Sequence, residues 1–168
     1  MNDKTITVRI TSVYGARTVY PVCETAKIFA AIAGTKTLKP ETINCIKALG
    51  YDGVEIPIFE LDEPLHRRWG ATLDGLGLER TAVTVRGPGD NPISPSAAVR
   101  AAAVDAMKRT LDCCHAAGVK TLVGPTHSAI GEFTGKGPTD DEFKWGVDTM
   151  RQVARHAAQA GWSTAVRM

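Results

Sequence analysis

Short apolar runs alternate along this chain with longer segments whose apolar residues recur every three or four positions. Residues 27–33 form an almost continuous apolar run, and residues 54–58, 81–85 and 121–123 are rich in β-branched and other apolar side chains. Runs of this length and composition are typical of strands, and strands buried on both faces are almost continuously apolar. The pattern therefore predicts four strands, with a fifth that begins at Ser163.

Segments with helical periodicity separate the predicted strands. The clearest helix extends from about residue 96 to residue 117, and Gly118 follows it, where a left-handed C-cap is expected. A shorter helix is predicted from Pro40 to Gly50, and the polar stretch 62–77 is predicted to be helical in part. The clearest helix carries one apolar stripe, which consists of Val104, Met107, Leu111 and Cys114.

The last predicted helix begins with a capping-box pattern formed by Thr139 and Glu142. The acidic residues of its first turn also favour the positive end of the helix dipole. Its spacing predicts an inward apolar face that consists of Phe143, Val147, Met150, Ala154 and Ala157.

Strands and helices thus alternate four times before the fifth strand begins. This alternation predicts an α/β fold in which helices cover a parallel sheet. Periodicity does not distinguish an open, doubly wound sheet from part of a barrel. In front of this region, residues 5–10 and 17–22 are β-rich on either side of a turn at residues 14–16, which predicts a β-hairpin.

The composition is that of an ordinary globular domain: the 168 residues are 43% hydrophobic and 23% charged. The 20 basic and 18 acidic residues give a formal net charge of +2 without a basic patch, which argues against a nucleic-acid-binding protein. No apolar run approaches the roughly 20 residues that span a bilayer, and the N-terminus lacks the pattern of a secretion signal. We therefore expect a cytoplasmic protein that binds neither nucleic acid nor membranes.

Two sequence patterns that carry chemistry in other proteins fail on spacing. The cysteines, Cys23, Cys45, Cys113 and Cys114, include no C-x-x-C pair, so we expect reduced and mostly buried thiols instead of a zinc or redox site. The glycine-rich segment 131–137 has three residues, not four, between its first glycine and its Gly-Lys pair, so it does not fit a phosphate loop.

Two polar residues have a physical reason to lie in a pocket. Glu55 is an acid within an apolar strand and requires a partner or a pocket; a buried carboxylate with structural hydrogen bonds is the alternative. His127 directly follows the fourth strand, and parallel sheets bind ligands at the carboxyl ends of their strands. Of the other histidines, His66 is expected in a charged loop, and His115 and His156 on solvated helix surfaces.

Three segments carry a further signal when they are read together. They are Asp52-Gly53-Val54-Glu55-Ile56, Ser94-Pro95-Ser96-Ala97-Ala98-Val99-Arg100 and Gly124-Pro125-Thr126-His127-Ser128, and the helix between the last two ends in Leu111-Asp112-Cys113-Cys114-His115. Their order and spacing, from about Lys39 to Gly161, resemble the D-tagatose/D-psicose 3-epimerase group of sugar isomerases and epimerases, within the xylose-isomerase-like TIM barrel superfamily.

This resemblance implies a reaction and a site. Members of the group invert a ketose carbon next to the carbonyl: a divalent metal such as Mn or Co polarises two substrate oxygens, and two glutamates exchange a proton. The metal ligands lie at the ends of strands five to eight, and the first half of the barrel lines the sugar pocket. By resemblance, Val83, Pro125 and Ile130 face a ketose substrate, with His127 in the same rim and Glu55 among the substrate-binding residues.

One departure from the family changes the expected activity. The family's fifth strand carries a metal-binding glutamate, whereas Gly161–Val166 leads here to Arg167, one residue before the last. We therefore interpret residues 27–168 as the N-terminal half of such a barrel, about four βα units, and residues 1–26 as an atypical extension. The expected product is a truncated or frameshifted isomerase fragment that has no metal ligand and no catalytic residue, and is inactive in isolation.

Two other functions remain open. A half-barrel leaves sheet edges and an apolar face uncovered, so a non-catalytic binding module that self-associates as a homo-oligomer is the main alternative. A relative of the endonuclease-IV-like metal nucleases would share the barrel class. The nearly balanced charge and the scarcity of histidines at strand ends argue against that nuclease.

Overall fold

The structure is a computed structural model that describes residues 40–160, together with the strand backbones at 6–11, 17–22, 29–31 and 165–167. In chain order the elements are β1 (Ile6–Thr11), β2 (Arg17–Val22), β3 (Phe29–Ala31), α1 (Pro40–Ala48), β4 (Gly53–Pro57), α2 (Glu63–Gly75), β5 (Glu79–Val83), the 3-10 turn η1 (Pro88–Asp90), α3 (Ala97–Ala116), β6 (Thr121–Val123), α4 (Asp140–Gln159) and β7 (Ala165–Arg167).

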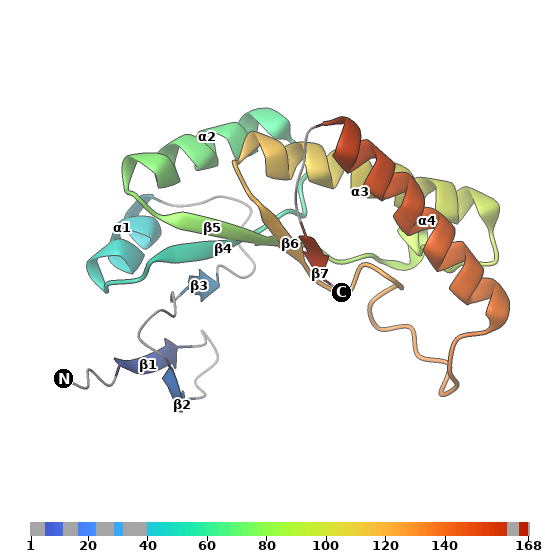
Figure 1. Cartoon of the computed structure of the whole chain (residues 1–168), viewed down its shortest axis with the longest axis horizontal. Coiled ribbons are helices and arrows are strands. Elements are labelled where there is room, and N and C mark those ends of the chain that lie inside the picture. Colours follow the sequence, from blue (N-terminus) through green and yellow to red (C-terminus); the bar gives the residue numbers. More distant parts are fainter. Residues whose placement is uncertain (1–5, 12–16, 23–28, 32–39, 161–164, 168) are drawn as a thin grey trace.

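Strands β3 to β7 form one parallel sheet, and their order in space is their order in the chain (Figure 1). In this sheet Ile56 pairs with Ala82, and Ala82 with Leu122. Parallel neighbours require a crossover connection, which α1 to α4 provide in turn. The predicted α/β fold is confirmed. The strand order does not reverse anywhere in the described sheet, whereas in a doubly wound sheet it reverses at a switch point, so the order is that of a barrel segment.

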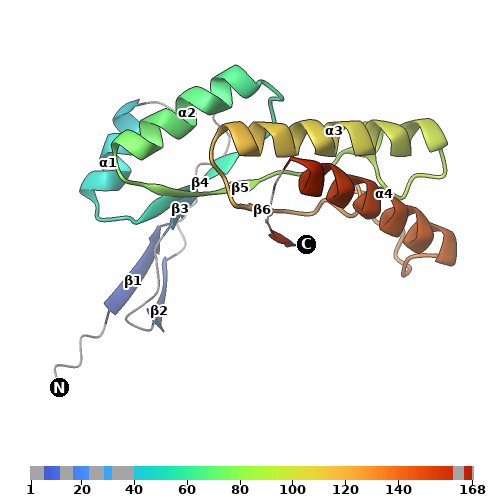
Figure 2. The ribbon, with the colours of Figure 1, turned by 45° about the horizontal axis from the view of Figure 1, so that its top comes forward.

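Helices α2 and α3 lie along one face of this sheet (Figure 2). The strand residues that point toward them are fully buried at 0% exposure, namely Val54, Ile56, Ala82 and Leu122. They belong to one core with side chains of α2 and α3 that include Leu73, Met107 and Leu111. Burying a large aliphatic side chain contributes roughly 1.5–3 kcal/mol, so this layer supplies the main stabilisation of the described chain.

The opposite face of the sheet is only half-buried. Glu55, Thr81, Val83 and Val123 alternate with the core residues and remain partly exposed. In a closed barrel the corresponding face points into the barrel, where side chains of all strands fill it. Glu55 therefore lies on the barrel-side face and is half-buried, so the alternative of a buried carboxylate is wrong.

Helix α3 confirms the clearest prediction from the sequence. It extends over Ala97–Ala116, and all four residues of its predicted stripe are buried. Gly118 has φ 68° and ends the helix in the left-handed region. The Val119 amide donates to the carbonyl oxygen of Cys114 at 2.9 Å, so the last turn closes as a C-cap requires.

Helix α4 begins where the sequence predicts, and its capping box forms. The Glu142 amide donates to Thr139 Oγ1 at 3.2 Å, and the Thr139 amide donates to the Glu142 carboxylate at 2.7 Å. On the side of α3, His156 Nε2 lies 2.7 Å from Asp112 Oδ1. His156 is therefore half-buried between two helices and does not occupy the solvated position expected from the sequence.

Of the predicted inward face of α4, Ala157 packs against the core, whereas the other four residues line a groove on another side. The buried residues of α4 are Thr149 and Val153, whereas Phe143 is 67% exposed, Ala154 is exposed and Met150 is half-buried. Helix α4 packs on α3, and the apolar face is turned to a side where the described chain supplies only loop residues. The spacing identified an apolar face correctly, but the neighbour of that face was misassigned.

His66 is a second correction, because it lies on α2 and is fully buried. The helix starts early: Asp62 caps it by accepting the Leu65 amide at 3.1 Å, and a proline lies in the first turn. His66 Nδ1 lies 2.7 Å from the Asp62 carbonyl oxygen, and its ring meets the edge of Trp69 with 4.9 Å between centroids. The charged residues around it belong to the solvent side of a helix.

The cysteine prediction holds in part. Cys113 and Cys114 are buried free thiols, whereas Cys45 is exposed on α1. Cys23 lies outside the described residues. Within the part of the chain that the structure describes, we find no helix whose length and apolar character would allow it to cross a bilayer.

At the N-terminus, β1 and β2 pair antiparallel as the predicted hairpin requires, although residues 12–16 lie outside the described part. The expected first barrel strand is present as β3, which pairs parallel with β4; the predicted strand residues on either side of Phe29–Ala31 are not described. The domain boundary after residue 26 stays a prediction.

Candidate functional site

The strands β4, β5 and β6 are parallel, so their carboxyl ends meet at one edge of the sheet. We call this the C-terminal edge and define it by the three segments that follow these strands, residues 58–62, 84–96 and 124–139. Such edges bind ligands in open and closed parallel sheets, because loops from several strands converge there. The candidate site is therefore built from these three loops.

The backbones of the three strands stay close beyond their last paired residues. The Ile58 amide donates to the Val83 carbonyl oxygen at 2.9 Å, and the Thr84 amide donates to the Val123 carbonyl oxygen at 3.1 Å. Gly124 then turns with φ 126°, and a Cβ at this position would lie 2.0 Å from the Thr84 carbonyl oxygen. Glycine is required here both by the conformation and by the contact.

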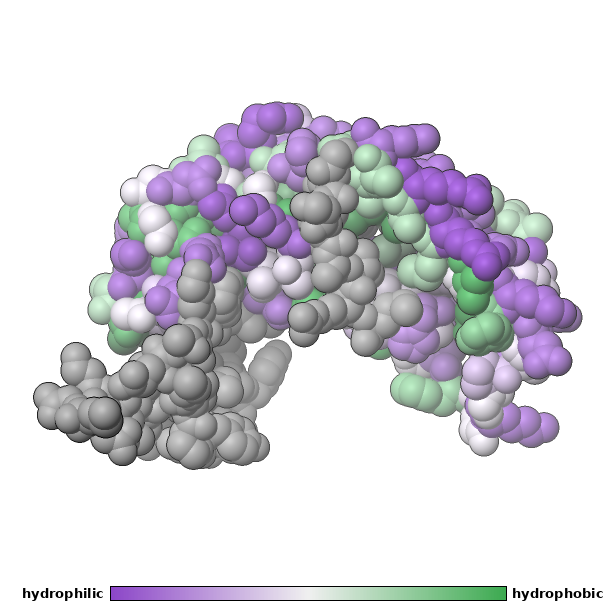
Figure 3. All heavy atoms as spheres, in the orientation of Figure 1, coloured by the Kyte–Doolittle hydropathy of each residue, from purple (hydrophilic) through white to green (hydrophobic). Residues whose placement is uncertain are grey.

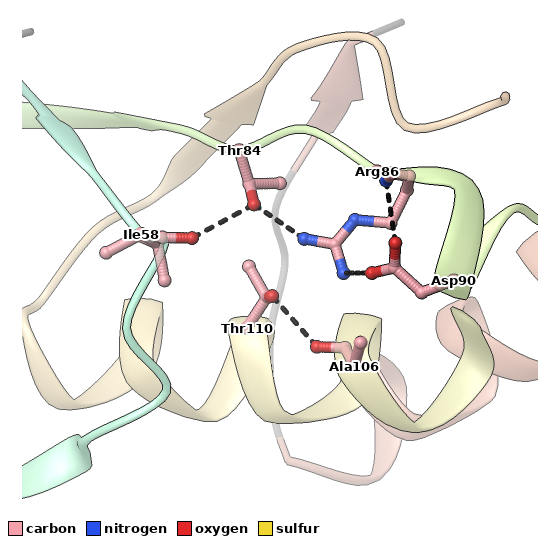
Figure 4. Close-up of polar contacts among 7 residues, drawn as sticks. Ile58, Thr84, Arg86, Asp90, Ala106 and Thr110 are labelled. Atoms are coloured by element: carbon pink, nitrogen blue, oxygen red, sulfur yellow. Dashed lines mark hydrogen bonds and ion pairs between the residues drawn. The ribbon is translucent and has the colours of Figure 1, made fainter. Parts of the chain in front are cut away.

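An arginine joins the first two loops (Figure 4). Arg86 donates through Nη2 to Thr84 Oγ1 and through Nη1 to Asp90 Oδ2, both at 2.8 Å. Thr84 Oγ1 in turn donates to the Ile58 carbonyl oxygen at 3.0 Å, and Asp90 Oδ1 accepts the Gly87 amide at 2.7 Å. The side chain of Arg86 is 6% exposed, so this is a buried, charge-assisted network.

The same residue also reaches the third loop, through its backbone. Arg86 forms a parallel bridge with Ala129, and the Ile130 amide donates to the Arg86 carbonyl oxygen at 2.8 Å. A second link between these loops is exposed: Asn91 Nδ2 donates to Glu132 Oε2 at 3.0 Å. Side-chain and backbone bonds therefore tie all three loops to one another.

The five residues predicted to bind substrate lie near this edge. Val83 is the last residue of β5, on the barrel-side face, and Glu55 lies on the same face of β4, two residues below Pro57, the partner of Val83. Pro125 and His127 belong to the loop after β6, and Ile130, 56% exposed, is the residue bonded to the Arg86 backbone. Their role in substrate binding stays a prediction.

His127 has a second neighbourhood, because it lines a groove of about 510 Å³ against α4. The groove is almost wholly apolar; the loop after β5 contributes Ile93, and the loop of His127 also contributes Pro138. Its floor is the uncovered face of α4 with Phe143, Val147, Met150 and Ala154. In Figure 3 hydrophobic surface lies beside the charged residues of α4 at this end of the molecule. The groove is therefore poorly suited to a polyhydroxylated ligand.

Burial sets the electrostatics of the arginine network. Desolvation lowers the pKa of the Arg86 guanidinium from its ordinary value, and the nearby Asp90 carboxylate opposes this effect through its charge and its hydrogen bond. Arginine remains protonated in proteins, so the network holds one buried positive charge with one acidic partner. Arg86 Nε and the fully buried Thr126 Oγ1 have no hydrogen-bond partner among the described residues.

The sequence reasoning missed Arg86, Thr84 and Asp90. One signal was available: Arg80, Ala82, Thr84 and Arg86 share one side of an alternating segment, and Ala82 is a core residue on that side. A polar residue on the core-facing row at the end of a strand requires hydrogen-bonding partners. The pairing with Asp90, four residues on, could not be anticipated because it depends on the 3-10 turn.

Comparison with known proteins bears on this architecture. The structure superposes on D-psicose 3-epimerase with D-tagatose from Clostridium cellulolyticum H10 (TM-score 0.71, 19% identity, 84% of this chain and 52% of that chain). It also superposes on an L-ribulose 3-epimerase (TM-score 0.73, 19% identity, 84% and 49%). A 3-keto-D-glucoside 4-epimerase from E. coli gives a TM-score of 0.65 at 22% identity, with 84% and 56% covered. Among curated protein sequences, none matches the chain.

A parallel α/β sheet with unreversed strand order and loops joined at its C-terminal edge defines the class: a segment of a (β/α) barrel. Residues 43–167 match the xylose isomerase-like TIM barrel family, and the chain belongs to that family. It spans about half the length of the solved epimerase structures on which it superposes. At these identities the superpositions show a shared fold.

The family resemblance implies a divalent metal, which would require several oxygen or nitrogen donors around one point. Among residues 40–160 no three histidine, cysteine, aspartate or glutamate side chains converge as a cation site would require. At the C-terminal edge Asp90 is bonded to Arg86, and Glu132 to Asn91. The described residues therefore do not fit a metal centre, and no reaction step is derived through one.

Proposed function

We propose that this chain is the ketose-binding half of an epimerase-type barrel. Its C-terminal edge would hold a ketose sugar, while the metal-assisted proton transfer next to the carbonyl would depend on groups outside this chain. The observation that carries the proposal is the joining of three strand-end loops by Arg86 and the Ile130 amide, which presents their residues at one edge of the sheet. Family membership and the superposition on ketose 3-epimerases support a ketose as the ligand.

The residues at this edge match the chemistry of a sugar. The His127 imidazole can donate to or accept from a hydroxyl group, and the Glu55 carboxylate accepts hydroxyl hydrogens. Val83, Pro125 and Ile130 offer apolar surface to the C–H faces of the sugar ring or chain. A pocket with a few polar groups on an apolar wall is the usual arrangement of a small-molecule site.

Calorimetric titration with D-psicose and D-tagatose, with D-glucose as the control sugar, tests the binding. We expect the ketoses to bind and the aldose to bind at least tenfold more weakly. In parallel, epimerisation is assayed with and without added Mn²⁺ or Co²⁺, and we expect no product from the isolated chain. Failure to bind either ketose would overturn the binding role, and metal-dependent turnover would overturn the claim that the chain is inactive by itself.

A second function, self-association, is favoured by two observations. The sheet order ends at β7, so that strand has no further partner within the described sheet, and unpaired strand edges promote association. The α4 face with Phe143 and Val147 is apolar and largely uncovered. We expect the chain to form a homo-oligomer by covering these surfaces.

Light scattering coupled to size exclusion tests this second function. The wild-type chain is expected to elute as a dimer or larger species, and Val147→Glu is expected to shift it toward monomer because a charge enters the apolar face. Gln152→Glu, on the exposed side of the same helix, is the matched control and should leave the mass unchanged. A stable monomeric wild-type protein would contradict self-association.

A further inference from the structure

The surroundings of Arg86 give little reason to expect that this buried cation stabilises the folded protein. Its side chain is 6% exposed, its Nε has no partner among the described residues, and one carboxylate balances its charge. Well-packed apolar residues often replace buried ion pairs without loss of stability, so such a pair is weak evidence of a stabilising role. A buried donor left without a partner costs roughly 1–3 kcal/mol in addition.

What sets Arg86 apart is that its hydrogen bonds form part of the links among the three loops of the C-terminal edge. One guanidinium nitrogen reaches the loop after β4 through Thr84 and the Ile58 carbonyl oxygen. The other nitrogen holds Asp90 and, through it, the turn after β5. The backbone carbonyl oxygen of the same residue accepts the Ile130 amide from the loop after β6. Removal of this side chain therefore acts directly on its own loop, at Thr84 and Asp90. It acts on the loop after β4 through Thr84, and on the loop after β6 through the position of the Arg86 backbone.

We infer that Arg86 is a positioning residue: it holds the three loops of the C-terminal edge in the single arrangement that a ketose would meet. The inference rests on the proposed function for the identity of the ligand, but the holding of the loops does not depend on it. The planar, forked guanidinium bonds Thr84 and Asp90 through two different nitrogens, which gives a reason for arginine at this position. No contact between Arg86 and the sugar is implied.

Arg80 offers a matched control on the same strand. It lies on the same side of β5 with its side chain 13% exposed, and it donates to the carbonyl oxygens of Gly70 at 3.0 Å and Ala117 at 3.2 Å. Both acceptors belong to the segments around α2 and α3 at the opposite edge of the sheet. A purely structural arginine and a positioning arginine can therefore be compared in one protein.

The primary experiment is hydrogen exchange followed by mass spectrometry on the wild-type chain, Arg86→Met and Arg80→Met. Arg86→Met is expected to raise exchange at least tenfold in residues 84–91 and in residues 124–132, with a smaller effect elsewhere. Arg80→Met is expected to raise exchange around residues 113–119 instead. If both variants raise exchange uniformly, or if Arg86→Met leaves residues 124–132 protected, the inference is wrong.

Two further variants keep the test decisive if Arg86→Met folds poorly. Arg86→Lys retains the charge beside Asp90 but offers one nitrogen where arginine uses two, so we expect an intermediate rise in exchange. Thr84→Val removes the bond to the Ile58 carbonyl oxygen and is expected to loosen the segment around residue 58 more than residues 124–132. Equal protection in wild type and both variants would contradict the assigned role.

Ligand affinity separates this inference from the proposed function. At equal folded fraction, D-psicose is expected to bind Arg86→Met at least tenfold more weakly than it binds Arg80→Met, which should match wild type. Equal affinities of the two variants would overturn positioning. If the wild-type chain bound no ketose while the regional exchange pattern held, the proposed function would fall and the holding of the loops by Arg86 would stand.

Discussion

The two edges of the sheet use similar residues for different purposes. At the start of β5, Arg80 bonds the carbonyl oxygens of Gly70 and Ala117 and pairs with Asp74, so it fastens α2 and α3 to the sheet. Six residues later Arg86 fastens loops to one another. Both side chains are largely buried, at 13% and 6% exposure. What they hold differs: Arg80 holds two helices, and Arg86 holds loops that carry candidate ligand groups.

This difference follows from the architecture of parallel barrels, in which the amino-terminal edge serves stability and the carboxyl edge serves function. Glycines show the same division. A Cβ at Gly70 of α2 would lie 2.8 Å from the Ala117 carbonyl oxygen, so the absence of a side chain allows α2 and the end of α3 to approach closely. A Cβ at Gly124 would lie 2.0 Å from the Thr84 carbonyl oxygen, so the absence of a side chain allows the ends of β5 and β6 to lie close together at the site.

The largest expected effect is that of Gly124→Ala. The substitution adds a side chain into backbone at a φ of 126°, so neither a small rotation nor a flexible neighbour can relieve the clash. We expect a loss of at least about 3 kcal/mol in the free energy of unfolding, in the range of severe core substitutions. Urea denaturation followed by circular dichroism measures the loss.

Two other glycines calibrate this result. Gly70→Ala, with its milder backbone contact at the opposite edge, is expected to destabilise less than Gly124→Ala. Gly135 has φ 70° and nothing within 4 Å of an added Cβ, so Gly135→Ala should cost only the roughly 1–2 kcal/mol of the left-handed conformation. If Gly124→Ala were as stable as Gly135→Ala, the ends of β5 and β6 would separate easily, which would contradict the close joining of their loops.

The second prediction concerns His127, which is exposed in the loop after β6. His127→Ala is expected to weaken D-psicose binding about tenfold, which corresponds to about 1.4 kcal/mol, because one hydrogen-bonding group to the sugar is lost. The free energy of unfolding should change by less than about 0.5 kcal/mol, as for most exposed positions. Calorimetric titration and urea denaturation of the same sample measure both quantities.

His115 is the control for this prediction, since it is exposed near the end of α3 at the amino-terminal edge. His115→Ala is expected to leave D-psicose affinity unchanged. If both substitutions weakened D-psicose binding equally, the sugar would not bind specifically at the C-terminal edge, and the proposed site would be wrong.

Much of the fold was predictable from sequence because it depends on local periodicity. The stripe of α3, its Gly118 cap and the Thr139 capping box were all found from spacing alone, since each is encoded within one or two helical turns. The packing of α4 was not predictable in the same way. Its spacing revealed an apolar face, but whether that face meets α3 depends on chain segments far apart in the sequence.

The candidate site was predictable only where it coincides with strand ends. His127 was found because it follows a strand directly, and the fold does place it at the C-terminal edge. Arg86 was missed because its role depends on a turn that brings Asp90 back to it and on the Ile130 amide from another loop. Periodicity places a residue on a face, and only the tertiary structure shows what it connects.

The last prediction concerns the reactivity of two thiols in the wild-type protein. Burial, together with the nearby carboxylates of Glu63 and Asp112, raises the pKa of the Cys113 thiol to about 11. At pH 8 only about one Cys113 thiol in a thousand is then ionised, and the thiolate is the reactive form. Cys45 is exposed, so iodoacetamide is expected to modify it at least a hundredfold faster in the native protein.

The raised pKa of Cys113 also determines how its contribution to the free energy of unfolding depends on pH. The folded state holds the Cys113 proton more tightly than the unfolded chain, so its contribution to stability is complete below the ordinary thiol value near 8.5 and declines as the pH rises toward about 11. Mass spectrometry of the alkylated peptides, with Cys45→Ser as the control that removes the fast site, measures the reactivity. Equal labelling of Cys45 and Cys113 at pH 8 would contradict the burial of the α3 terminus.

This labelling sharpens the comparison of the two edges. The Cys113 carbonyl oxygen accepts the Ala117 amide at 3.0 Å, and the Ala117 carbonyl oxygen accepts a bond from Arg80. Arg80→Met should therefore loosen the last turn of α3 and speed the alkylation of Cys113 severalfold, whereas Arg86→Met should leave it slow because its bonds lie at the other end of β5. If Arg86→Met exposed Cys113 as much as Arg80→Met did, the two edges would unfold as one unit, and the division between a stabilising and a ligand-facing edge would not hold at the level of local stability.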